Sequence, residues 1–217
     1  TYVITITGTG GSLAREATLT VEVTSGSACL IATAAYGSEL SDEVQFLREF
    51  RDRLILKTST GSDFMIAFNA WYYSFSPSVA QFTSEHPAAG TATRVALYPL
   101  IGILKIGAAA FHLFPTNLEA GAVASGLVVS SLVGLVYLAP PLTLVLAYST
   151  RMRRVAKRLQ MPAVAALLGA LAVVGLTTVL AGPAVVMMAG TSTIVLASLI
   201  ASALLASQVI LGMAERL

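Results

Sequence analysis

The sequence predicts a mainly α-helical integral membrane protein, with a C-terminal helical bundle, an amphipathic helical module before it and a short N-terminal β-hairpin. Of its 217 residues, 56% are hydrophobic and only 11% are charged, whereas a soluble domain carries about 25% charged residues. The charges are also unevenly placed, because residues 1–94 hold most of the acidic side chains and residues 95–217 consist largely of apolar runs. We therefore expect a water-exposed part at 1–94 and a membrane domain at 95–217.

Residues 1–24 are predicted to form two antiparallel strands around turn residues at 8–12, because hydrophobic and polar side chains alternate on both sides of the turn. A lone hairpin is only marginally stable in water, so more sheet is expected around it. The pair resembles the end of an immunoglobulin-like (Ig-like) sandwich, with a Tyr-x-Ile-x-Ile strand followed by a Leu-x-Val-x-Val strand. That resemblance implies an extracellular domain. Since no export signal precedes it, residue 1 is not expected to be the true start of the protein.

A short linker separates the hairpin from a predicted amphipathic helical module at 29–94. Ser41 is a suitable N-cap, and the helix after it offers two i,i+4 charge pairs, Arg48–Asp52 and Glu49–Arg53. The next helix is expected to end at Pro77, or a new one to start there. Its aromatic residues are interpreted as the core of the module, an interfacial belt or a ligand box. These residues are Phe64, Phe68, Trp71, Tyr72 and Phe75.

The membrane domain contains four apolar segments, at 95–114, 120–148, 162–189 and 193–214. The last three are predicted to span the bilayer, since about 20 apolar residues suffice to cross it. The first is expected to be interfacial or re-entrant, because it contains Pro99, Lys105 and His112. A lysine in the middle of a membrane costs about 2.5–3.5 kcal/mol. Pro162 is placed to start the helix of the third segment.

Five basic residues lie together between the second and third segments and are predicted to form a cytoplasmic loop, because basic loops face the cytoplasm. They are Arg151, Arg153, Arg154, Lys157 and Arg158. Binding of lipid headgroups or of a partner is the alternative role. If the N-terminal region is extracellular, one or three crossings must precede this loop, so 95–114 is expected not to cross. The C-terminus is then cytoplasmic, in a multi-pass protein of the plasma membrane.

Small residues recur every fourth position in the second segment, at Ala122, Gly126, Ser130 and Gly134. Such a stripe lets helix backbones approach closely, which favours helix association in lipid. We expect the four residues to form a packing seam within the chain. A docking face for another membrane subunit is the alternative.

No pattern of catalytic, cofactor-binding or metal-binding residues is recognisable in the sequence, so the chain is not expected to be an enzyme or to bind a small-molecule substrate. The single cysteine, Cys29, excludes an internal disulfide, and His86 and His112 lie far apart. The glycine-rich turn at 8–11 joins two strands, so it is a poor phosphate loop. The net charge of +2 is too small to indicate nucleic acid as a partner.

Several motifs in order resemble the C-terminal domain of the CFI-box family. Cys29 to Ser38 read CLIATAAYGS, where the family pattern opens Cys-Phe-Ile-Ala-Thr-Ala, so Leu30 replaces a phenylalanine. VQFLREFRDR follows at 44–53, and two later runs, FNAWYYSFSP at 68–77 and LYPLIG at 97–102, are similar to the archaeal branch. The apolar pair at 162–214 goes beyond the family pattern.

The resemblance implies a sorting or anchoring module with no established chemistry, placed after Ig-like repeats at the C-terminal end of surface proteins. Cys29 matches the leading cysteine of the family and is a candidate for modification or anchoring; a buried, inert thiol is the alternative. We therefore expect a non-enzymatic anchor that holds an extracellular Ig-like protein in a prokaryotic cell membrane, which the resemblance implies is archaeal. The alternative is an accessory structural subunit of a larger membrane complex. The expected partners are the bilayer, other membrane or cell-surface subunits, and a second copy of the chain.

Overall fold

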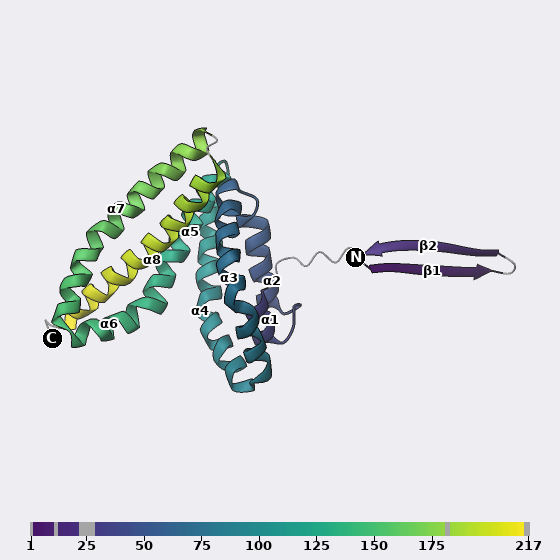
Figure 1. Ribbon diagram of the computed structural model, residues 1–217, viewed down its shortest axis with the longest axis horizontal. Coiled ribbons are helices and arrows are strands. Elements are labelled where there is room, and N and C mark those ends of the chain that lie inside the picture. The colour runs from purple at the N-terminus through teal and green to yellow at the C-terminus, as the bar shows by residue number, and fades with distance from the viewer. Residues whose placement is uncertain (1, 11–12, 22–28, 181–182, 215–217) are drawn as a thin grey trace.

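The computed structural model describes residues 2–10, 13–21, 29–180 and 183–214, with side chains at 29–149, 151–178 and 183–214. The described chain is mainly helical (Figure 1). Strands β1 (Tyr2–Gly10) and β2 (Leu13–Val21) pair antiparallel as a sheet of two strands, with Tyr2 opposite Val21. Two strands alone do not support a sandwich, so the Ig-like domain stays a prediction.

The amphipathic module begins with helix α1 (Leu30–Tyr36), which ends at Gly37 in the left-handed conformation with φ of 74°. Helix α2 (Asp42–Glu49) has Ser41 as its N-cap, as predicted, and runs into a π-helical segment, η1 (Phe50–Ile55). Of the two predicted charge pairs, Glu49–Arg53 is present at 3.3 Å. The pair Arg48–Asp52 is wrong, because each residue has another partner of opposite charge: Arg48 binds Glu39 at 2.9 Å, and Asp52 binds Arg51 at 2.6 Å.

Helices α3 (Ser59–Glu85) and α4 (Pro87–His112) form an antiparallel pair, of 27 and 26 residues. Pro77 lies inside α3 and does not end it. Buried residues on both sides of the proline, such as Met65 and Thr83, hold the two halves in one helix despite the missing N–H. Helix α4 starts eight residues before the predicted segment 95–114 and runs without a turn, so it is not re-entrant.

The second apolar segment is one long helix in three parts: α5 (Leu118–Val133), the π-helical segment η2 (Gly134–Leu138) and α6 (Ala139–Tyr148). The π-helical turns directly precede Pro140 and Pro141. Since prolines donate no backbone hydrogen bond, a local widening of the helix accommodates them without ending it.

Helices α7 (Thr150–Leu180) and α8 (Ala184–Ala214) correct four predictions. A single span over 162–189 is wrong, because α7 ends at Leu180 and a second helix, α8, begins at Ala184, directly after Pro183. The last span starts at Ala184 and not at residue 193. The basic residues at 151–158 are not in a loop but occupy the first turns of α7, because arginine and lysine are good helix formers. Pro162 lies inside α7 and does not start the helix.

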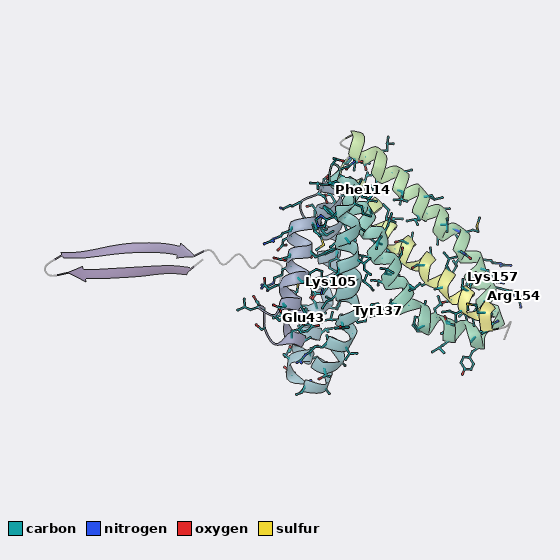
Figure 2. All side chains as sticks on the ribbon, turned by 180° about the vertical axis from the view of Figure 1, so that it is seen from behind. Glu43, Lys105, Phe114, Tyr137, Arg154 and Lys157 are labelled. Carbon is teal, nitrogen blue, oxygen red and sulfur yellow. The ribbon has the colours of Figure 1, made fainter. Side chains whose placement is uncertain are left out.

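Four helical stretches of the described chain are long and apolar enough to cross a membrane, which is the architecture of a multi-pass membrane protein. They are Pro87–His112, Leu118–Tyr148, Arg151–Thr178 and Ala184–Ala214. Helix α8 contacts α3, α5, α6 and α7, whereas α7 lies at the outside of the bundle (Figure 1). Phe114 lies at one end of the helices, and Arg154 and Lys157 lie at the other (Figure 2).

Candidate functional site

The middle of α8 packs closely against the end of α5 and against η2. The hydroxyls of Ser130 and Ser198 bond to each other, although the residues are 68 positions apart in the chain. A Cβ atom added to Gly134 would overlap the carbonyl oxygen of Leu199 and the hydroxyl of Ser202. Helix backbones therefore meet at this seam, as small residues permit in lipid.

Three of the four residues of the predicted stripe are buried, namely Ala122, Ser130 and Gly134. Gly126 differs, because a Cβ atom added there would meet nothing within 4 Å. Its carbonyl accepts a hydrogen bond from the Ser130 hydroxyl at 2.6 Å, so its role is within the helix. The stripe is thus close-packed at its two ends and open at Gly126, where an added side chain has room.

A second seam, between α4 and α5, was not predicted. A Cβ atom on Gly107 would overlap a methyl group of Val129 and lie 3.2 Å from the Ser125 hydroxyl. A Cβ atom on Gly121 would lie 2.8 Å from the carbonyl oxygen of Phe111. The signal in the sequence that could have indicated this seam is the run of small residues at 107–110.

A carboxylate ties the starts of α3 and α5 together. One carboxylate oxygen of Glu119 accepts hydrogen bonds from the backbone N–H of Ser59, at 2.7 Å, and from its hydroxyl, at 2.8 Å. The other accepts from the backbone N–H of Thr60, at 3.0 Å, and from its hydroxyl. The carboxylate thereby satisfies amide groups that have no partner within α3 and lies where the helix dipole favours negative charge.

Cys29 is the N-cap residue of α1 and is half-buried. Burial raises the pKa of the Cys29 thiol, and the nearby guanidinium groups of Arg51 and Arg48 offset this only in part. The following helix is held against α3 by a hydrogen bond from the Ile31 N–H to the Tyr72 hydroxyl, at 3.2 Å. The protonated thiol is therefore the favoured form near neutral pH, and its modification stays a prediction.

The basic residues at the start of α7 divide into two kinds. Arg151, Arg154, Lys157 and Arg158 are exposed to the surroundings of the bundle. Arg153 turns back to α6, where its Nε donates to the carbonyl of Leu146 at 2.8 Å. It thereby satisfies a carbonyl at the end of that helix, a structural role that the sequence did not indicate.

The aromatic residues of α3 stack along the helix, with ring centroids of Phe68 and Tyr72 5.7 Å apart and those of Trp71 and Phe75 4.9 Å apart. Trp71 is 62% exposed, and Tyr72 contacts α1. An apolar groove of the protein lies elsewhere, between α1, α4 and the α5–η2 junction, and is lined by residues such as Leu97, Leu100 and Val133. The aromatic group does not line this groove.

Among the residues that the structure describes, no group of three or more His, Cys, Asp or Glu side chains is placed to hold a metal ion. No protein-family model, curated protein or solved structure matches the chain.

Proposed function

We propose that the chain is a non-enzymatic membrane anchor, which holds an extracellular Ig-like region at the surface of an archaeal cell. The observation that carries the proposal is the packed bundle of four apolar helices that are long enough to cross a bilayer. Two further features support it: exposed basic residues gather at one end of the bundle, and the motifs that resemble the CFI-box family run from Cys29 into the first of these helices. Basic segments at the ends of spans favour the cytoplasmic side.

Trypsin treatment of intact cells tests this orientation. We expect the protease to cut at Arg15, before the helical part, and to leave the cluster from Arg151 to Arg158 uncut until the membrane is permeabilised. Mass spectrometry of the released and retained peptides shows in one experiment whether each of the two sites was cleaved. Protection of Arg15 together with cleavage of the basic cluster in intact cells would reverse the orientation and rule out a surface anchor.

A second candidate is an accessory subunit of a larger membrane complex, or an oligomer of this chain. A groove along α7 and α8 supports it, since the groove is lined by small residues at which another helix backbone would fit closely. Its lining includes Ala166, Gly169, Ala189 and Gly190. Purification in a mild detergent separates the candidates. Unrelated membrane subunits that co-purify in a fixed ratio would favour the complex, and a chain that purifies alone would favour the anchor.

A further inference from the structure

Helix α3 has the length of a membrane span, although its composition is more polar than that of the four spans above. Between Asp63 and Glu85 it contains no charged residue. At 1.5 Å per residue, the uncharged stretch at 64–84 is about 31 Å long. The hydrocarbon core of a bilayer is about 30 Å thick. The charged residues of α3 thus lie where the two headgroup regions would be.

Helix α3 presents a mixed exposed face, in which Ser74, Ser78, Gln81 and Ser84 lie among large apolar side chains. Its exposed side chains include the large apolar residues Ile66, Trp71 and Phe82, which are 55%, 62% and 56% exposed. Ser76 and Thr83 are turned inward and are almost fully buried. In water this arrangement would expose apolar area and bury hydroxyls, whereas acyl chains suit the apolar face.

The contact of Glu119 with Ser59 and Thr60 fixes which end of α3 lies where. It places the start of α3 beside the start of α5, at the turn that follows α4. Helices α4 and α5 also lie side by side, since Gly107 contacts Ser125 and Gly121 contacts Phe111. Therefore α3 and α4 run alongside α5, in opposite directions to each other, so a membrane that α4 and α5 cross would also surround α3.

We infer that α3 is a fifth membrane-crossing helix, whose exposed apolar face contacts lipid acyl chains. The inference rests on the proposed membrane location. Three crossings, by α3, α4 and the α5–α6 helix, then separate the amphipathic module from the basic residues of α7. The module lies outside and the basic residues inside, in agreement with the positive-inside rule. With only the four more apolar helices crossing, the module and the basic residues would lie on the same side.

This arrangement accounts for the charges near the outer surface. Lys105 is two turns from the end of α4, so its ammonium group can reach the outer headgroups, and it lies 5.6 Å from the ring centroid of Phe46 on α2. Arg51, Asp52 and Arg53 lie within two turns of Thr58, where α3 begins, and each belongs to an ion pair. Paired charges at headgroup depth are far less costly than charges in the hydrocarbon core.

Cysteine accessibility at four exposed positions tests the inference. The full chain with Cys29→Ala carries Lys57→Cys, Ala88→Cys, Thr116→Cys or Tyr148→Cys, one substitution at a time. A membrane-impermeant maleimide is added to intact cells and, separately, to permeabilised cells. Insertion of a protease cleavage site at the same four positions shows, independently of thiol reactivity, on which side of the membrane each position lies.

Five crossings predict that positions 57 and 116 react in intact cells, and that positions 88 and 148 react only after permeabilisation. Positions 57 and 88 on the same side would overturn the fifth crossing. If that side is the outside, α3 and α4 both stay out of the membrane; if it is the inside, α4 crosses without α3. The fully inverted pattern, with 57 and 116 inside, would keep five crossings and overturn the proposed surface anchor instead.

Discussion

Helices α7 and α8 have the same length, 31 residues, and their most apolar stretches are similarly hydrophobic, yet they occupy opposite positions in the bundle. Helix α8 is the most buried of the four candidate spans and α7 the least. Most of the inward positions of α8 are small or hydroxylated, such as Thr191, Ser198 and Ala201, while α7 turns Leu168 and Leu176 outward. In a membrane protein, then, the positions of small residues distinguish an interior helix from a peripheral one, whereas total hydrophobicity does not.

The largest expected effect is that of bulk at the closest backbone approach to α8. Gly134→Leu places a side chain where Leu199 and Ser202 already lie. Overpacking of this kind costs about 1–3 kcal/mol. We expect a clear loss of thermal stability in detergent. Gly126→Leu is the matched control, two turns away on the same continuous helix but with open space around it, and should be close to neutral. Equal destabilisation by the two substitutions would contradict the close approach at Gly134.

A smaller effect is expected for the buried hydroxyl pair between α5 and α8. Interhelical hydrogen bonds in membranes contribute about 0.6 kcal/mol on average, and each serine also bonds within its own helix. A double-mutant cycle of Ser130→Ala and Ser198→Ala, followed by unfolding in mixed micelles, should give a coupling energy of that order. Thr178→Ala on the exposed face of α7 is the control and should be neutral. A coupling of zero would mean that the two hydroxyls do not interact.

The smallest expected effect concerns the reactivity of Cys29, a half-buried residue of the amphipathic module. Because burial raises the pKa of the Cys29 thiol, little thiolate forms near neutral pH. Alkylation by iodoacetamide should be several-fold slower in the folded chain than in the denatured chain at the same pH. The rate should rise only at pH values above those at which an ordinary thiol ionises. A folded rate equal to the denatured rate at neutral pH would indicate an exposed, reactive thiol and favour its modification in the cell.

The membrane half of the fold could be predicted from the sequence, because long uncharged apolar runs are unfavourable in water. The helix boundaries could not be predicted as well. Pro77, Pro99 and Pro162 lie inside helices that tertiary packing keeps continuous, whereas Pro183 separates two helices. A proline alone does not show which of these outcomes applies, since the result depends on the contacts that the flanking turns make.

Of the candidate site, only the features that depend on a single helix could be predicted from the sequence. The four-residue spacing found Ser130 and Gly134, because periodicity on one helix is a property of the sequence. Which member of the stripe has a partner depends on the other helix, and Gly126 has none within 4 Å. The contact of Glu119 with Ser59 joins residues 60 positions apart, so no local pattern indicates it. Lys105 lies two turns from the end of α4, a position that the sequence did not indicate because the end of the helix was not known.

The central claim is that the exposed apolar face of α7 is in contact with lipid. Spin labels at Arg154, Met161 and Leu168 test it along a single helix, at positions that are all exposed and accept a label without overpacking. In reconstituted vesicles, collision rates are measured with oxygen, which concentrates in the bilayer, and with a water-soluble nickel chelate. The account predicts that Leu168 collides mainly with oxygen, Arg154 mainly with the nickel chelate, and Met161 with an intermediate ratio. Collision of Leu168 with the nickel chelate as frequent as that of Arg154 would place this face in water and contradict the account.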